Sequence, residues 1–372
     1  MSTVSPASSG RSVATAEQRP VPELEVRDLS VVYPGRRGQA PARAVDGVNL
    51  RIGRGEIVAL IGESGCGKST LARALVGLVK PTGGHVLYQG TPLEYGTRAL
   101  KRYRRHVQLV LQDPGGALNP KQNVYDAVAE GPRLHRLTEG LPRTVHGSLA
   151  KAGLRPPQDF VARYPHELSG GQQQRVVIAG ALALNPSVIV ADEPVASLDA
   201  SVRGEILKLL LSLRDGLGLS ALVVSHDLGL AWNIADRVAV MYLGRVVEQG
   251  PVEQVLLRPR HPYTQALLSV IPDGRPDWRP TLLTGEPPDP TAVPAGCRFH
   301  PRCPRWAAAE GERRVAAACD RRELPVLAAG EGTDRIAGTV STAGAAETRN
   351  GSAAACHLLD DEETATPSEM TS

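Results

Sequence analysis

A glycine-rich loop near residue 62 carries the clearest chemistry in the sequence. The apolar run 57–61 leads into Gly62-Glu63-Ser64-Gly65-Cys66-Gly67-Lys68-Ser69, and Thr70 continues into a helix-like segment. Glycine permits backbone angles that a Cβ forbids, so successive N–H groups can face phosphate oxygens, and the start of a helix adds a positive pole. The loop predicts a nucleoside-triphosphate site in which Lys68 reaches the β- and γ-phosphates and Ser69 reaches a magnesium ion.

Two carboxylates end a second apolar run. The run 188–191 stops at Asp192 and Glu193. Taken alone, such a pair is usually a strand end that meets solvent. Its position after a phosphate-binding loop favours Asp192 as a magnesium ligand and Glu193 as the base that takes a proton from an attacking water.

A second set of small residues has the same anion-binding chemistry. Ser169, Gly170 and Gly171 stand between Leu168 and Gln172, ahead of a helical stretch. Small residues at the start of a helix leave N–H groups and a hydroxyl free to approach a phosphate.

In this order, the segments resemble the motifs of ATP-binding cassette ATPases. The resemblance spans residues 24–272 and implies an α/β fold of the P-loop NTPase type, with a RecA-like core, an antiparallel β-subdomain and a helical subdomain at about 113–180. Gly62 to Ser69 is similar to the Walker A motif, Gln112 to the Q-loop, and Leu168 to Gln172 to the signature. Asp192-Glu193 is similar to the Walker B motif, Ser197-Leu198-Asp199 to the D-loop, and Ser225-His226-Asp227 to the H-loop.

The resemblance also implies roles for single residues. Tyr33 matches the aromatic residue that stacks on adenine, with an ordinary strand aromatic as the alternative. Gln112 matches the residue that touches magnesium and the attacking water, and His226 the residue that contacts the γ-phosphate. In this family the signature of one subunit closes over the nucleotide of another, so a head-to-tail dimer is expected, with Asp199 in its D-loop.

The elements that position these residues can be read from the same sequence. We expect strands over 24–60 and 84–92, with turns at Asp46-Gly47 and Gly83-Gly84. The basic cluster 101–106 reads as a solvated helix face, with contact to anionic lipid or a partner as the alternative.

Composition narrows the class of protein. The 372 residues include 42 basic and 39 acidic side chains, so the balance of charge gives no footprint for nucleic acid. The apolar runs are far shorter than the roughly twenty residues that cross a bilayer. Residues 1–22 lack the apolar core of a signal peptide and are expected to form a disordered leader in the cytoplasm.

The C-terminal region resembles one branch of the family. Residues 258–272 are similar to the segment that follows the cassette in the ATPases of oligopeptide, dipeptide and nickel importers. The extension 273–372 resembles the cysteine region of that branch, in which some members hold a [4Fe–4S] cluster. Four cysteines suit such a cluster or zinc equally well, and unliganded thiols are the alternative. A disordered insert is expected over 328–355, and the four residues are Cys297, Cys303, Cys319 and Cys356.

The resulting interpretation is an ATPase subunit of a peptide-type importer, resembling the second of the two paired ATPases. It would use ATP and Mg²⁺ at the cytoplasmic face of the membrane, together with a second ATPase, two permease subunits and an external solute-binding protein. The alternative is a soluble cassette protein that acts as a switch on ribosomes or DNA. Copurification with integral membrane subunits would separate the two.

Overall fold

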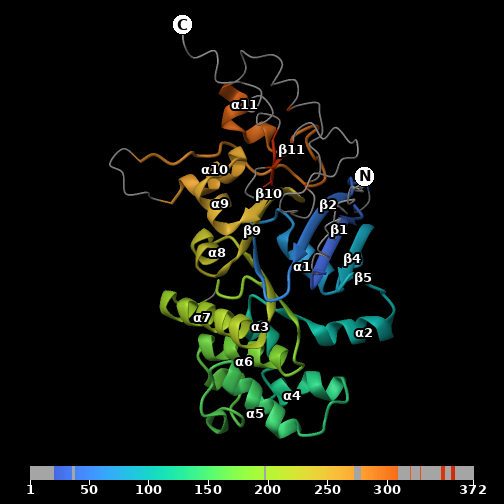
Figure 1. The fold of residues 1–372 in the computed structure, drawn as a ribbon, viewed down its shortest axis with the longest axis vertical. Coiled ribbons are helices and arrows are strands. Elements are labelled where there is room, and N and C mark those ends of the chain that lie inside the picture. The colour runs from blue at the N-terminus through green and yellow to red at the C-terminus, as the bar shows by residue number, and fades with distance from the viewer. Residues whose placement is uncertain are drawn as a thin grey trace, which may run out of the picture.

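Two β-sheets, a helical arm and a C-terminal extension make up the computed structural model (Figure 1). The structure describes residues 21–35, 38–196, 198–271 and 278–308, together with Cys319, Leu327 and the segments 345–347 and 353–356. The helical arm lies at one end of the molecule and the extension at the other, with the sheets between them. Residues 1–20 of the predicted leader lie outside the described residues.

The larger sheet is formed by β3 (Ile57–Ile61), β6 (Val107–Val110), β7 (Val188–Asp192), β8 (Ser220–Ser225), β9 (Arg237–Tyr242), β10 (Arg245–Pro251), β11 (Ala345–Glu347) and β12 (Ala353–Ala355). Its order across the described residues is β11-β12-β10-β9-β3-β8-β7-β6. The strands from β9 to β6 are parallel to their neighbours, whereas β10, β12 and β11 each pair antiparallel. The parallel part therefore gathers the carboxyl ends of several strands at one edge.

The parallel strands are buried on both faces. Along β7, Val188 and Val190 pack into one core cluster, whereas Ile189 and Ala191 pack into the other. Helix α1 (Lys68–Leu75) belongs to the first cluster. Since neither face meets water, these strands read as uninterrupted apolar runs, which is why the sequence reveals them so clearly.

Helices follow the strands in chain order. The helical arm consists of α3 (Pro114–Ala117), α4 (Val124–Leu134), α5 (Leu141–Lys151) and α6 (Gly170–Leu182). The remaining helices after α1 are α2 (Thr97–His106), α7 (Ala200–Leu217), α8 (Leu228–Ile234), α9 (Val252–Leu257), α10 (Pro262–Ser269) and α11 (Pro304–Ala308).

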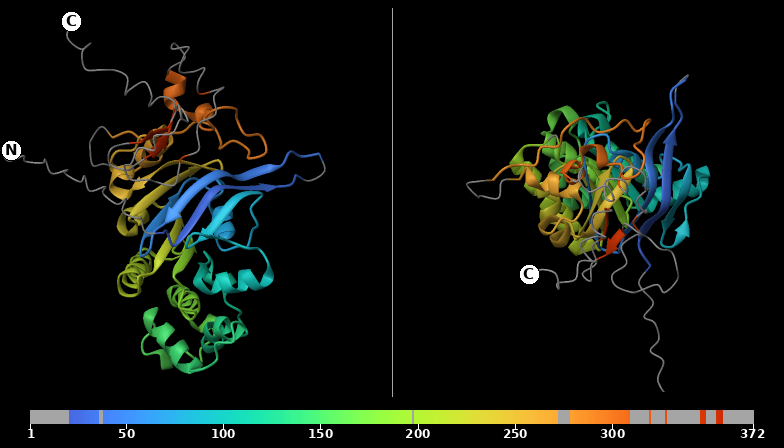
Figure 2. Two further views of the ribbon diagram at one scale, coloured as in Figure 1. Left: turned by 45° about the vertical axis from the view of Figure 1, so that its right-hand side comes forward. Right: turned by 90° about the horizontal axis from the view of Figure 1, so that it is seen from above.

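Two predicted turns are wrong, because both segments lie within strands of the smaller sheet. Its strands β1 (Leu24–Tyr33), β2 (Ala42–Ile52), β4 (Gly83–Tyr88) and β5 (Thr91–Pro92) pair antiparallel in the order β2-β1-β4-β5. Figure 2 shows β1 and β2 as a long paired ribbon. Asp46-Gly47 lies inside β2 and Gly83-Gly84 at the start of β4, so neither reverses the chain. Both lie opposite register shifts, where a positive φ of 65° at Gly47 and 71° at Gly84 accommodates a bulge.

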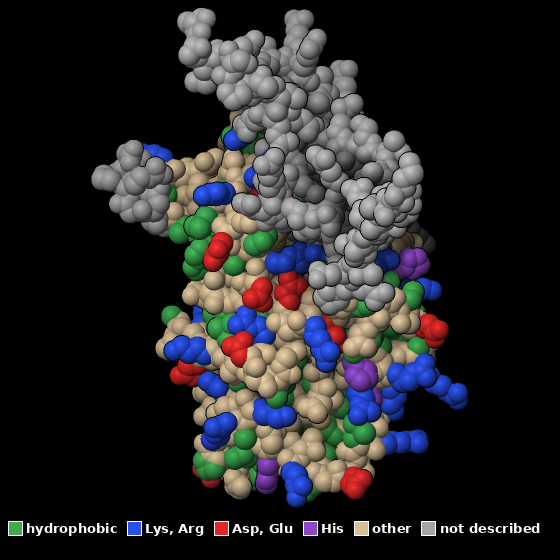
Figure 3. All heavy atoms as spheres, in the orientation of Figure 1, with side chains coloured by type: hydrophobic (Ala, Val, Ile, Leu, Met, Phe, Trp, Pro, Cys, Tyr) green, Lys and Arg blue, Asp and Glu red, His purple; other side chains and the backbone are tan. Residues whose placement is uncertain are grey.

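The predicted basic segment 101–106 forms the second half of α2. Arg98, Lys101, Arg102 and Arg105 are exposed on this helix, as expected for a solvated face. Figure 3 shows Lys and Arg side chains projecting from the edge of the molecule where α2 lies.

The extension shares its core with the cassette. Phe299 is 1% exposed and packs edge-on against Tyr242 of β9, with ring centroids 5.2 Å apart. Cys297 and Cys303 belong to the same buried cluster as β9 and α1. The predicted disordered insert 328–355 needs correction where it is described, because β12 pairs with β10 through Glu248 and Ala354, and β11 pairs with β12. The unpaired edge of β10 accounts for this added strand.

None of the helices in the described ranges is long and apolar enough to cross a membrane.

Candidate functional site

A cavity of about 550 Å³ opens at the carboxyl end of β3. The glycine-rich loop from Ser64 to Thr70 forms its floor. The other lining residues come from six separate parts of the chain, namely Arg43, Ala44, Gln112, Glu193, His226, Leu243, Gly244 and Pro290. This edge of an open parallel sheet is where α/β proteins bind their ligands.

The loop packs against backbone on two sides. A Cβ at Gly62 would lie 2.2 Å from the carbonyl oxygen of Met241, and a Cβ at Gly67 would lie 2.1 Å from that of Ala44. Both glycines also have positive φ, 155° and 110°. Glycine is therefore required twice, for space and for conformation.

Lys68 lies inside the loop. Its Nζ donates hydrogen bonds of 2.8 Å to the carbonyl oxygens of Gly62 and Glu63, and the residue is 5% exposed. Burial raises the pKa of the neighbouring Cys66 thiol, which keeps that side chain neutral. The loop thus carries one cation and N–H dipoles, the equipment of an anion site.

Ser69 and Asp192 meet across the cavity floor. The hydroxyl of Ser69 donates to Oδ1 of Asp192 at 3.1 Å. Burial raises the pKa of the Asp192 carboxyl, and the hydrogen bond from Ser69 partly opposes that rise. Two hard oxygen donors stand side by side, as magnesium prefers.

Glu193 and His226 form a second pair at the cavity wall. Nδ1 of His226 lies 3.2 Å from Oε1 of Glu193. Glu193 has a positive φ of 49°, and its N–H donates to the carbonyl of Val224 on β8. The two adjacent strand ends therefore fix the pair, while the His226 side chain remains 64% exposed toward the cavity. Gln112, just beyond β6, also lines this cavity.

The signature residues do not line this cavity. Ser169 caps α6 in a reciprocal box, in which its hydroxyl accepts from the Gln172 N–H and its own N–H donates to the Gln172 side chain. Ser169 and Gly170 are exposed, and Leu168 is buried beneath them. At Gly171 a Cβ would lie 2.5 Å from Val202 of α7. The helix start is therefore presented outward, away from this chain's own loop.

Two other predicted residues, Tyr33 and Asp199, are not among those that line the cavity. Tyr33 is 39% exposed and pairs with Ala42 in β2, next to the lining residue Arg43, but it does not line the cavity itself. Asp199 is exposed at the N-cap of α7. Ser197 of the D-loop motif lies outside the described residues.

Glu63, which was predicted to bind nucleotide, is held by residues outside the cavity. It does not line the cavity, its carboxylate pairs with Arg302, and its N–H donates to the hydroxyl of Tyr263. Both partners lie about 200 residues or more away along the chain. No local pattern could have revealed them, and the same is true of Pro290, whose carbonyl accepts from the Arg43 N–H at 3.0 Å.

The four predicted tail cysteines are all buried and free of disulfides. Burial, together with the smaller electrostatic effect of the Cys356, Cys319 and Cys303 thiols, raises the pKa of Cys297 to about 12. The thiols therefore lie within electrostatic reach of Cys297. Among the described residues, however, no three His, Cys, Asp or Glu side chains are grouped as a metal site. The donor chemistry suits a metal, whereas the ligand geometry is not formed.

Two family models match the sequence. One, described as ABC transporter, matches residues 45–196, and one described as oligopeptide/dipeptide transporter, C-terminal region, matches residues 247–309.

Several curated proteins are similar over most of their length. The dipeptide transport ATP-binding protein DppF of Escherichia coli (strain K12) is 46% identical over 302 residues, which cover 78% of this chain and 89% of that protein. The oligopeptide transport ATP-binding protein OppF of Salmonella typhimurium is 43% identical over 309 residues, covering 78% and 91%.

Solved structures share the fold. cbiO1 from Clostridium perfringens, part of the ABC transporter complex cbiONQ, aligns with a TM-score of 0.58 and 33% identity, covering 64% of this chain and 91% of that one. The ATP-binding cassette MJ0796, in a dimeric post-hydrolysis state bound to ADP and Pi, aligns with a TM-score of 0.56 and 31% identity, covering 62% and 98%. The predicted fold class is confirmed.

The two-sided packing of the loop can be tested with a matched pair of alanines. Gly67→Ala places a Cβ against the Ala44 carbonyl, whereas at Gly65, where φ is also positive at 79°, a Cβ meets nothing within 4 Å. Positive φ alone costs about 1–3 kcal/mol. We expect Gly67→Ala to weaken ATP binding by more than about tenfold and Gly65→Ala to weaken it much less, measured by calorimetric titration with thermal unfolding recorded for both. Equal losses would contradict the close-packing argument.

Proposed function

Because this chain belongs to the ATP-binding cassette family, with the C-terminal region of the oligopeptide and dipeptide transporters, we propose that it hydrolyses ATP to power the import of peptides or related small solutes. ATP hydrolysis is the activity of the family. The observation that carries the proposal is the pair of contacts at one cavity, Ser69 with Asp192 and Glu193 with His226, beside the loop that holds Lys68.

The residues of the cavity divide the work of hydrolysis. The loop N–H groups and Lys68 bind the phosphates, and Lys68 exchanges its carbonyl partners for phosphate oxygens. Ser69, Gln112 and Asp192 would hold magnesium, which neutralises charge on the phosphates when bound. Glu193 accepts the proton of the attacking water, and His226 orients Glu193 and reaches the γ-phosphate.

The second half of each site comes from another subunit. The exposed N-terminus of α6, with Ser169 and Gly171, is available to a phosphate held elsewhere. The dimeric state of the similar cassette MJ0796 supports this arrangement. The partner here is a second ATPase subunit of the same kind, with this chain as the second of the pair. Tyr33, beside the lining residue Arg43, stacks on adenine.

The subunit works with membrane proteins at the cytoplasmic side of the cell membrane. Two permease subunits carry the solute, and an external solute-binding protein delivers it. The relatives named above are transport proteins, which favours this proposal over a switch on ribosomes or DNA.

The tail cysteines would hold a [4Fe–4S] cluster, with zinc as the alternative. The support is chemical, since three other buried thiols lie within electrostatic range of Cys297 and thiolates suit either metal. Binding would require Cys297, Cys303, Cys319 and Cys356 to lose their protons and to close into ligand geometry, and burial opposes the first step by raising the pKa of Cys297 and of Cys303.

The general base is tested by Glu193→Gln, which keeps the shape of the side chain but cannot accept a proton. We expect ATP hydrolysis by the assembled complex to fall by about 10²-fold or more while ATP binding persists and closed dimers accumulate. Phosphate release and size-exclusion chromatography measure the two effects, and Glu253→Gln on the exposed face of α9 is the control. Near-normal turnover would show that the proton goes elsewhere.

The shared site is tested by Ser169→Arg. The bulky cation should leave the ATP affinity of the isolated chain within about twofold and abolish ATP-dependent dimers in the Glu193→Gln background. Because Ser169 also caps α6, the matched control is Asn123→Arg, which removes the N-cap of α4 instead and should leave dimers intact. A loss of affinity in the monomer would place the signature against its own nucleotide.

The metal is tested by analysing protein purified without oxygen. A cluster predicts a brown protein that contains iron and labile sulfide, a colour that Cys303→Ala removes and Cys66→Ala, in the phosphate loop, retains. Colourless protein with stoichiometric zinc would select the alternative. Protein with neither metal would remove the proposed site.

A further inference from the structure

Two residues from the C-terminal region hold Glu63 of the phosphate loop. The guanidinium of Arg302 forms a bidentate ion pair with the Glu63 carboxylate, in which Nη1 donates to Oε2 at 2.7 Å and Nη2 to Oε1 at 3.2 Å. The hydroxyl of Tyr263 accepts from the Glu63 N–H at 2.9 Å. Side chain and backbone of one loop residue are thus both engaged, and none of these groups faces the nucleotide cavity.

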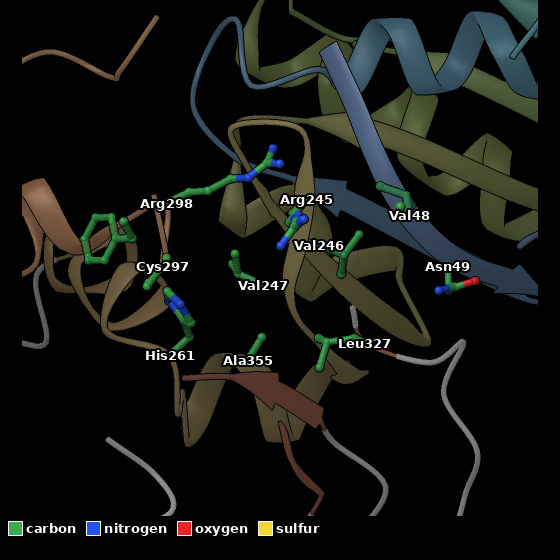
Figure 4. A pocket seen from close by; sticks show the side chains of 13 residues that line it. Val48, Asn49, Arg245, Val246, Val247, His261, Cys297, Arg298, Leu327 and Ala355 are labelled. Atoms are coloured by element: carbon green, nitrogen blue, oxygen red, sulfur yellow. The ribbon is translucent and has the colours of Figure 1, made fainter. Parts of the chain in front are cut away.

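The same segment reaches the loop from a second direction. Arg298 donates to the carbonyl of Leu243, at 2.5 Å, and to the carboxylate of Asp46. The next residue of that turn, Gly244, donates its N–H to the carbonyl of Cys66 at 2.8 Å. In Figure 4, Cys297 lies beside His261 while Arg298 extends the other way. Adjacent residues of one short segment therefore belong to the cysteine region and contact the phosphate loop or the turn beside it.

Aromatic packing keeps this segment from shifting. Phe299 lies between the two arginines in sequence, and its ring is 5.2 Å from that of Tyr242 and 5.4 Å from that of Tyr263. The rings of Tyr242 and Tyr263 are 4.7 Å apart. Phe299, Tyr242 and Tyr263 are each at most 1% exposed. A close-packed group of this kind transmits displacement rather than absorbing it.

We propose that the segment Cys297–Cys303 is a brace for the phosphate-binding loop and that Arg302 is its positioning residue. Arg302 touches no substrate and acts through Glu63. With the carboxylate held, the loop is already ordered before ATP arrives, so binding does not have to supply that order. The inference rests on the proposed ATPase function and adds a site of control to it, because whatever loosens the cysteine segment also loosens the loop.

Coupling of this kind is reciprocal. If the ordered brace strengthens ATP binding by some factor, then ATP must stabilise the brace by the same factor. Residues 300, 302 and 303 donate backbone hydrogen bonds within the segment, and Cys297 donates to the Cys319 carbonyl. Their exchange with deuterium reports opening of the brace whether or not the cysteines hold a metal.

The first experiment is a double-mutant cycle in the full-length chain, using Arg302→Met, Glu63→Gln and both together. ATP affinity is measured by calorimetry and folding by thermal unfolding. We expect each single change to weaken ATP binding roughly tenfold and the double variant to be no weaker than either one, because all three lose the same contact. Arg302→Lys should restore only part of the affinity, since an ammonium cannot form the fork. Arg279→Met, which alters an exposed arginine of the same extension, is the control.

Removing one charge of a partly buried pair such as Arg302 and Glu63 can unfold a protein. Tyr263→Phe provides the variant that keeps both charges and the aromatic packing while removing only the acceptor for the Glu63 N–H. We expect weaker ATP binding here as well, with little change in thermal stability. Unchanged affinity in folded Arg302→Met and in Tyr263→Phe would overturn the proposal.

The second experiment is hydrogen exchange with and without ATP and magnesium. In the unaltered chain, ATP should slow exchange in peptides covering 62–70 and 297–303. In Arg302→Met, saturating ATP should still protect 62–70, which it contacts directly, but no longer protect 297–303. Protection of 297–303 that persists in Arg302→Met would overturn the brace. Absence of ATP binding by the unaltered chain would instead refute the proposed function.

Discussion

The site depends on direct contact between backbone segments. The phosphate loop lies against the carbonyl of Met241 at the end of β9 and against that of Ala44 in β2, with no side chain between them, because Gly62 and Gly67 have none. The two contacts belong to different sheets, so the loop also sets how closely the antiparallel sheet approaches the parallel one. A shift of either sheet would therefore displace the loop. The rest of the cavity is arranged around this fixed floor.

The positions of the charged side chains in the cavity follow from that arrangement of the loop and strands. Lys68 is buried in the loop with two carbonyl oxygens as its partners, while Asp192 and Glu193 approach from the end of β7. A buried cation held by neutral acceptors is ready to exchange them for phosphate oxygens, which carry full charge. The adjacent strand β8 holds Glu193 through Val224 and continues directly into His226. Parallel strands bring these side chains together because their carboxyl ends share one edge of the sheet.

The sequence was sufficient where the chemistry is local. The loop, the carboxylates after β7 and the cap of α6 are contiguous patterns, and the structure brings the first two to one cavity. The prediction was wrong for the turns at Asp46-Gly47 and Gly83-Gly84, because a glycine that makes a bulge has the same local signature as one that ends a strand. It also missed the partners of Glu63. A glutamate in a phosphate loop predicts contact with ligand, and only the folded chain reveals an arginine 239 positions away.

The C-terminal region is therefore better described as part of the nucleotide domain than as an appendage. A separate module would bury its own core, whereas Phe299, Cys297 and Cys303 complete a cluster begun by β9 and α1. Strand β12 also ties the C-terminal region to the cassette, since it pairs with β10 at the sheet edge directly before Cys356. Cys297, Cys303 and Cys356 thus lie at the ends of segments that are packed on the cassette. Cys297 and Cys303, whether protonated or bound to metal, pack into a core that also supports the phosphate loop. This shared core is the physical basis for coupling between the cysteine region and the phosphate loop.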